Sequence, residues 1–380
     1  MSEIFFHFSL FTFNYLNTIL VTRDGKGKVV NLTSEPQQIS SKSINRLKVV
    51  GIILTLFGVA LFVYFIYAVG VHEIFEGVKR FGFAGFGVIV FIYFLRIYAR
   101  AYAWKLSVHE PYSLRFRDTI PAVVIGEAMS STIPLGILIS GTSKAVAVRR
   151  HIPLVAGLSS VATENLFYSF TTGLFLILGA VVFLRGFLID ESVIVTIDVL
   201  IASLAILIVL GLIMVIRQWH FASETCEWLY KKGYFRRFLE NIRLDVRLFE
   251  NLIYGFYRRY PKRFLPICGI ETIYHLLGIA EVWFILSRLS DSYPSLLDSF
   301  LLESVSRLIT IVFKLVPFVI GVDEAGAQFV GSTVALAAGI GVTLAIIRKG
   351  RIFFWTAIGV ILIIKRGLSI REISEAVEAE

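Results

Sequence analysis

The sequence predicts an all-α, polytopic membrane protein, a helical bundle with two broken, re-entrant helical elements and one interfacial amphipathic helix. Hydrophobic residues make up 56% of the 380 residues, and the mean hydropathy is +0.77. Several apolar runs reach the roughly 20 residues with which a helix crosses about 30 Å of hydrocarbon. The alternating apolar and polar segments of a membrane β-barrel are absent from the sequence.

The net charge of +9 does not indicate a nucleic-acid partner. The basic residues lie in short segments that flank apolar runs, as the positive-inside rule requires of cytoplasmic loops. The same distribution predicts a multi-pass protein of the plasma membrane with a cytoplasmic C-terminus. Cys226 lies in a basic segment and Cys268 in a hydrophobic one, so no disulfide is expected between them.

The chain divides into three parts. We expect residues 1–47 to form an interfacial and flexible segment and residues 48–366 to form the transmembrane domain. Residues 367–380 are expected to be an acidic tail. The first spans are expected from Val49 to Val69 and from Phe83 to Trp104, with an amphipathic segment between them. Within the second span, Arg96 and Arg100 share a helix face. We expect them to snorkel to headgroups, and the alternative is that they hold an anionic group.

The most unusual stretch runs from Thr119 to Arg150. It is long and apolar enough to cross a bilayer, yet it contains Glu127, Pro134, several glycines and Lys144. Broken, polar backbone at membrane depth is tolerated where protein buries it or where it lines a watery cavity. Because both ends of the stretch are basic, we predict a re-entrant hairpin that turns near Pro134. The alternative is a kinked packing helix.

The next apolar span carries Glu164 and Asn165, and an ionisable residue at that depth indicates a functional site. A simple hydrogen bond between helices is the alternative. The segment 217–263 is strongly basic, and its apolar residues recur at helical spacing between Phe235 and Phe256. This pattern predicts an amphipathic helix on the inner leaflet.

Glu271 and His275 lie one helical turn apart in the following span, which predicts a proton-sensitive pair. No third ligand is near them, so we expect no metal.

A further span carries Glu303, Arg307 and Lys314 on roughly one face, which must point into the bundle or into water. It leads into a second break, where a proline and a glycine precede Asp323 and Glu324. One interrupted segment in each half of a chain indicates a transporter's binding site. After a small-residue helix, residues 348–351 are interpreted as a basic turn before the last span.

Three places in the sequence resemble the transmembrane-domain family of the lysylphosphatidylglycerol synthetase/flippase. Ile133-Pro134, Gly141 to Lys144 and Arg149 to Pro153 are similar to the family's proline, glycine-rich turn and Arg-Arg-x-x-Pro. Ser159 to Asn165 resembles its intramembrane Ser-x-x-x-x-Glu-Arg, and Pro317 to Glu324 resembles its Pro-x-x-Gly-(Leu/Ile)-Gly-x-x-Glu. The resemblance spans about Lys48 to Arg366 and implies a stand-alone, lipid-translocating domain without the soluble synthetase.

The chain departs from the family pattern at three points. Thr142-Ser143 stand where the family has Gly-Glu, Asn165 stands where it has Arg, and Gly321 is the one glycine that remains of a pair. These departures leave the substrate open more than the fold.

Three functions are therefore weighed. The first is a flippase that moves an anionic or zwitterionic lipid, or a lipid-linked intermediate, between leaflets without a cofactor. The second is a membrane enzyme with Glu164 or the Asp323-Glu324 pair as acid or base, although no metal-ligand set, nucleophile elbow or nucleotide loop is found. The third is a scaffold for another membrane enzyme, and self-association into a homo-oligomer stays open.

Overall fold

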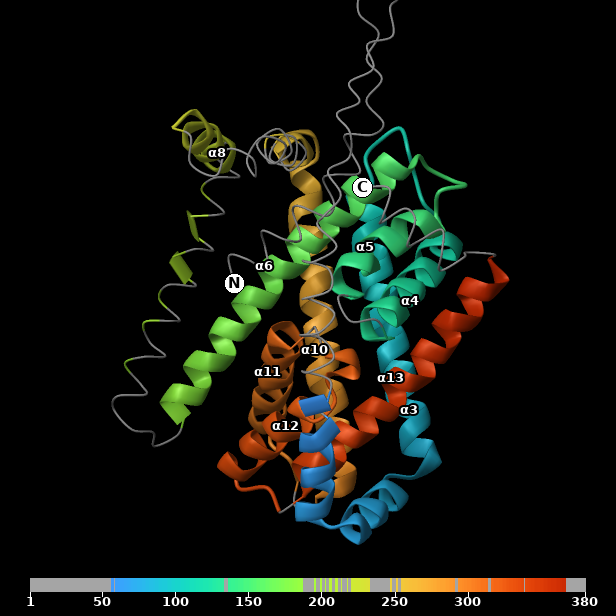
Figure 1. Ribbon diagram of the computed structural model, residues 1–380, viewed down its shortest axis with the longest axis vertical. Coiled ribbons are helices and arrows are strands. Elements are labelled where there is room, and N and C mark those ends of the chain that lie inside the picture. The colour runs from blue at the N-terminus through green and yellow to red at the C-terminus, as the bar shows by residue number, and fades with distance from the viewer. Residues whose placement is uncertain are drawn as a thin grey trace, which may run out of the picture.

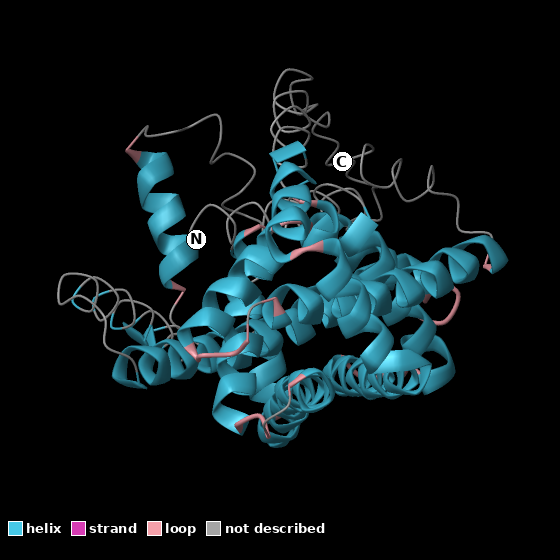
Figure 2. Cartoon of the chain, turned by 90° about the horizontal axis from the view of Figure 1, so that it is seen from below, coloured by secondary structure: helices cyan, strands magenta, loops and turns pink. Residues whose placement is uncertain are grey.

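The computed structural model describes residues 56–57, 59–132, 136–186, 220–232, 254–290, 293–313, 316–337 and 339–366, with isolated positions between 195 and 251. Within these ranges the chain forms helices and short connections and no strand (Figures 1 and 2). The predicted all-α class is confirmed for this part of the chain. The predicted amphipathic helix between Phe235 and Phe256, the segment 1–47 and the tail 367–380 lie outside the described residues, apart from isolated positions and residues 254–256.

The helices follow one another in a simple order. They are α3 (Val71–Ser107), α4 (Phe116–Thr132), α5 (Gly136–Ala147), α6 (Leu154–Gly186), α8 (Phe221–Lys231), α10 (Phe264–Leu289), α11 (Leu296–Val312), α12 (Val322–Thr333) and α13 (Ile340–Lys365), with single 3₁₀ turns η1 (Pro261–Arg263) and η2 (Pro317–Val319). Among the described residues, three helices are long and apolar enough to cross a membrane: Val71–Ser107, Ala156–Phe183 and Pro261–Leu289.

Helix α3 consists of two segments that meet at Gly82. This residue has φ 69° and ψ 172°, a backbone conformation open to glycine and strained for other residues. The break separates the predicted amphipathic segment before residue 81 from the predicted span that begins at Phe83. The blue ribbon of α3 bends at this place in Figure 1.

Helices α4 and α5 form an antiparallel hairpin. Gly126 lies against Lys144, and a Cβ at Gly126 would stand 2.8 Å from the Lys144 Cγ. At the open end of the hairpin, Arg366 donates hydrogen bonds to the carbonyls of Ala147 (3.0 Å) and Arg117 (3.4 Å). Both ends of the hairpin therefore lie at one end of the molecule. The 12 residues of α5 span about 18 Å, too short to cross a bilayer.

Helices α11 and α12 form a second antiparallel hairpin around η2. Gly326 of α12 packs so closely on Ile309 of α11 that an added Cβ would overlap the isoleucine side chain. Phe318 and Val319 in the turn have φ of 55° and 51°, which is rare for residues other than glycine. A turn of this shape ends α11 and starts α12 in a new direction.

The two hairpins enter from opposite ends. At one end, Arg263 of η1 donates to the carbonyls of Leu106 (3.3 Å) and Val108 (3.1 Å), which joins the end of α3 to the start of α10. At the other end, Arg80 donates to the carbonyl of Leu289 at 3.3 Å. Helices α3 and α10 are therefore antiparallel, and the hairpin that follows each of them starts at opposite ends of the bundle.

The described helices thus show the same order of lengths twice, in opposite orientation. A long helix precedes a 17-residue helix, a 12-residue helix and another long helix: first α3, α4, α5 and α6, then α10, α11, α12 and α13. Inverted repeats of this kind occur in many membrane transporters. The tip of the second hairpin contacts α4 and α13, where the Phe318 ring packs 4.6 Å from the Phe353 ring.

One end of the molecule is strongly basic, and we call it the basic end. It holds Lys105, Arg115, Arg117, Arg149, Arg150, Arg258, Arg259, Lys262, Arg263, Lys365 and Arg366. Their segments are joined by the Arg263 and Arg366 bonds described above. The opposite end carries the starts of α3, α11 and α13.

Candidate functional site

Charged side chains fill the middle of the bundle. Thirteen of them in the described residues are at most 9% exposed: Arg96, Arg100, Lys144, Glu164, Glu271, Glu281, Glu303, Arg307, Asp323, Glu324, Arg348, Lys349 and Arg351. A charge inside a low-dielectric environment is costly unless it is paired and hydrogen-bonded. We call this set the charged core.

Glu164 on α6 is the centre of the first part of the charged core. Arg100 of α3 donates through Nε to the Glu164 Oε1 at 2.6 Å and through Nη2 to the Asn165 Oδ1 at 3.3 Å. Lys144 of α5 places Nζ 3.7 Å from the Glu164 Oε2. The shorter helix of the first hairpin is thus held to α6 by a buried ion pair, and α3 pairs with the same carboxylate.

Glu271 on α10 completes the first part of the charged core, and no hydrogen-bond donor contacts it in the described residues. It is 0% exposed, and neither of its oxygens has a hydrogen-bond partner in the described residues. Its carboxyl group interacts with that of Glu164 and lies within electrostatic range of Arg100 and Lys144. Four helices therefore bring two cations and two carboxyl groups together.

The predicted Glu271–His275 pair does not form. His275 Nε2 lies 3.1 Å from the Thr172 Oγ1, and its ring stacks on Phe175 at 4.7 Å. The spacing of one turn placed both residues on a common face, but packing against α6 turned the imidazole toward Thr172. Among the described residues, no group of three or more His, Cys, Asp or Glu side chains is placed to hold a metal ion.

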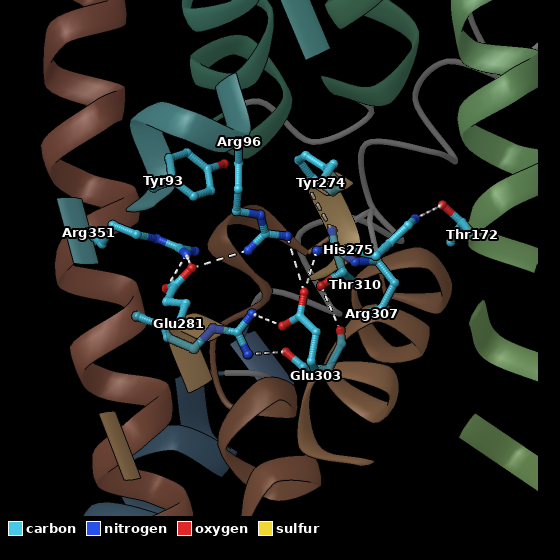
Figure 3. Close-up of polar contacts among 12 residues, drawn as sticks. Tyr93, Arg96, Thr172, Tyr274, His275, Glu281, Glu303, Arg307, Thr310 and Arg351 are labelled. Carbon is cyan, nitrogen blue, oxygen red and sulfur yellow. Dashed lines mark hydrogen bonds and ion pairs between the residues drawn. The ribbon is translucent and has the colours of Figure 1, made fainter. Parts of the chain in front are cut away.

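Glu303 on α11 is the centre of the second part of the charged core. It accepts from Arg96 (3.1 Å) and Arg307 (2.7 Å) through Oε1. Its Oε2 accepts from Arg348 of α13 at 2.7 Å. Figure 3 shows the guanidinium groups gathered around this carboxylate.

Glu281 on α10 lies next to this group. It accepts from Arg96 at 3.2 Å and forms a close ion pair with Arg351. Arg96 therefore bridges two carboxylates, as Figure 3 shows. The Arg351 guanidinium also lies over the Tyr93 ring, 4.0 Å from its centre.

Asp323 and Glu324, at the start of α12, form the third part. Glu324 accepts from the Gly321 backbone N–H at 2.8 Å and pairs with Lys349 at 2.8 Å. Asp323 accepts from the Ser306 hydroxyl at 2.7 Å, and Arg348 donates to the same hydroxyl at 3.0 Å. Carboxylates in the first turn suit the partial positive charge of a helix N-terminus. The second break is thereby tied to α11 and α13.

Two tyrosines connect the parts. Arg100 lies over the Tyr168 ring at 4.1 Å, and Arg96 lies over the Tyr274 ring at 4.3 Å. Arg307 approaches both hydroxyls, at 3.5 Å for Tyr168 and 3.4 Å for Tyr274. The charged core is therefore one continuous network of ion pairs, hydrogen bonds and ring contacts.

The remaining predicted residues lie at the edge of this network or outside the described residues. Glu127 of α4 is half-buried, and the Tyr93 hydroxyl donates to it at 3.4 Å. Pro134 and Lys314 lie outside the described residues. Glu303 and Arg307 face inward as predicted, whereas Leu308 on the other side of α11 is 46% exposed.

Two further sequence interpretations were wrong. Arg96 and Arg100 do not snorkel, because both are buried and paired with carboxylates. Residues 348–351 are not a turn, since they lie inside the continuous 26-residue helix α13. The apolar residues on both sides of 348–351 are the signal that could have revealed one helix with charges at its centre.

The fold and the charged core define a polytopic helical membrane protein with two opposed hairpins and a polar interior. The chain belongs to the family described as the lysylphosphatidylglycerol synthase TM region, whose model matches residues 48–359. The resemblance found in the sequence is thus confirmed. No curated protein and no solved structure matches the chain.

Proposed function

We propose that the protein moves a membrane lipid with an anionic or zwitterionic headgroup between the two leaflets. One observation carries this proposal: two short helical hairpins enter from opposite ends of the bundle and contribute charged side chains to one buried network. Lys144 comes from the first hairpin, and Glu303, Arg307, Asp323 and Glu324 come from the second.

The physical problem of lipid translocation matches this arrangement. A headgroup that crosses hydrocarbon loses its hydrogen bonds to water, at a cost of several kcal/mol for each unpaired polar group. Cations such as Arg100 and Lys144 can replace water around a phosphate, and guanidinium groups do so through paired hydrogen bonds. Membership of the family supports the same assignment, and the basic end is proposed to face the cytoplasm.

The test is lipid movement by the purified, full-length protein in vesicles. A fluorescent phosphatidylglycerol is distributed over both leaflets, and a membrane-impermeant reductant then quenches the label that reaches the outer leaflet. Vesicles with protein should lose fluorescence beyond the outer-leaflet share, and empty vesicles should not.

Lys144→Ala should slow this movement about tenfold or more, since a charge-assisted contact contributes roughly 1.5–3 kcal/mol. Lys79→Ala is the matched control, because the Lys79 side chain is 68% exposed and pairs with Glu76 at the surface. Equal rates in vesicles with and without protein would contradict the proposal, as would equal rates for the wild type and Lys144→Ala.

A further inference from the structure

The charged core contains one contact that ion pairing does not explain. The buried carboxyl groups of Glu164 and Glu271 interact with each other, and no donor in the described residues reaches either oxygen of Glu271. The Glu164 Oε2 is also without a hydrogen bond, although Lys144 lies 3.7 Å away. Two adjacent carboxylates repel each other in a low-dielectric interior, and a proton shared between them removes the repulsion and supplies the missing donor.

The surroundings fit a proton better than a metal ion. Arg100 from α3 and Lys144 from α5 pair with Glu164 and act electrostatically on Glu271, and Glu127 from α4 acts electrostatically on Lys144. On α10 itself, Cys268 lies on the preceding turn. A metal cation between the carboxyl groups would meet two fixed positive charges, whereas a shared proton needs only the two oxygens.

We propose that Glu164 and Glu271 form a proton-binding site and that protons are the coupling ion of the transport. The coupling role rests on the proposed function, and the proton site does not. When one carboxyl group is protonated, its O–H donates to the carboxylate of the other. On release, that proton leaves and both groups become carboxylates that face Arg100 and Lys144.

The net charge of Arg100, Lys144, Glu164 and Glu271 links proton binding to the choice of substrate. Within these four buried groups, the charges of two cations and two carboxylates sum to zero, and one bound proton raises the sum to +1. The loaded site therefore favours an anionic phosphate, and by linkage a bound anion favours the loaded site. A lipid with a net negative headgroup should move together with a proton, and a zwitterionic lipid should respond less to a pH gradient.

The first experiment observes the proton directly and needs no transport. Infrared spectra of the full-length protein in lipid nanodiscs should show the C=O stretch of a buried protonated carboxyl group at neutral pH, where an isolated glutamate is ionised because its pKa is about 4.3. Glu271→Gln should remove this band, and the exposed Glu76→Gln should keep it. A spectrum without the band, or one unchanged in Glu271→Gln, would overturn the site.

The second experiment tests the coupling. An imposed pH gradient should drive labelled phosphatidylglycerol across wild-type vesicles in the direction of proton flow, and it should act less on labelled phosphatidylcholine. In Glu271→Gln, the gradient should no longer change the rate of lipid movement, because the amide can donate to Glu164 and mimics the loaded form. Wild-type movement that ignores the gradient would overturn the coupling. The infrared band without movement of any lipid would support the proton site and overturn the proposed function.

Discussion

Removing the charge of Glu303 should destabilise the protein more than removing any surface carboxylate. In Glu303→Gln, the side chain keeps its size but loses the charge that faces three guanidinium groups. Arg96 retains Glu281 as an acidic partner. Arg307 and Arg348 retain only hydroxyl partners among the described contacts, namely two tyrosines for Arg307 and Ser306 for Arg348.

The expected magnitude follows from the number of uncompensated charges. Breaking one buried ion pair by removing a partner costs about 3–5 kcal/mol. Two arginines lose their carboxylate here, so the loss of unfolding free energy should reach at least the lower bound, about 3 kcal/mol. The corresponding fall in melting temperature is roughly 6–12 °C, at about 2–4 °C per kcal/mol.

The assay is thermal unfolding of the purified protein in detergent, followed by intrinsic fluorescence. Glu76→Gln is the control, since its pair with Lys79 is exposed and such pairs contribute about 0–1 kcal/mol. If Glu303→Gln melted within about 2 °C of Glu76→Gln, the Glu303 carboxylate would not hold the arginines together, and the reasoning about the charged core would be refuted.

Three further predictions concern the basic end and the first hairpin. Arg263→Ala should lower stability by about 1–3 kcal/mol in thermal unfolding, because it leaves two carbonyls at the end of α3 without their donor, whereas Lys262→Ala should not. Burial lowers the pKa of His109, with Arg263 adding to the effect. The unfolded chain binds a proton at His109 more readily than the folded protein does. The free energy of unfolding should therefore have its full value above about pH 6.5 and fall as the pH drops below it. His109→Gln should flatten this dependence of melting on pH. Gly126→Val should destabilise the first hairpin by about 1–3 kcal/mol, because Lys144 already fills the space beside Gly126. Gly87→Val is the control and should destabilise the protein less, since nothing lies within 4 Å of a Cβ at Gly87. Equal melting temperatures of the two variants would contradict this packing.

Much of the architecture could be predicted from local signals. Long apolar runs indicated membrane helices, and proline and glycine among polar residues indicated the two interruptions. Charges recurring at helical spacing placed Glu303 and Arg307 on one inward face. These features depend on residues close in the sequence, so a single sequence reveals them.

The pairing inside the charged core could not be predicted in the same way. Arg348 contacts Glu303 across 45 residues, and Arg96 contacts Glu281 across 185. A charge in an apolar run indicates that some partner exists, but the partner depends on how helices pack. The same limit explains the error at residues 348–351, since the charges that end an apolar run in sequence are neutralised in the fold by carboxylates from α10, α11 and α12.

The most direct test of the account is a cryo-electron microscopy structure of the protein in nanodiscs made with phosphatidylglycerol. The account predicts headgroup density between the hairpins, with a phosphate in contact with Lys144 or Arg100. Lipid density confined to the outer surface of the bundle, with the charged core closed by its own ion pairs in every class of particles, would contradict it.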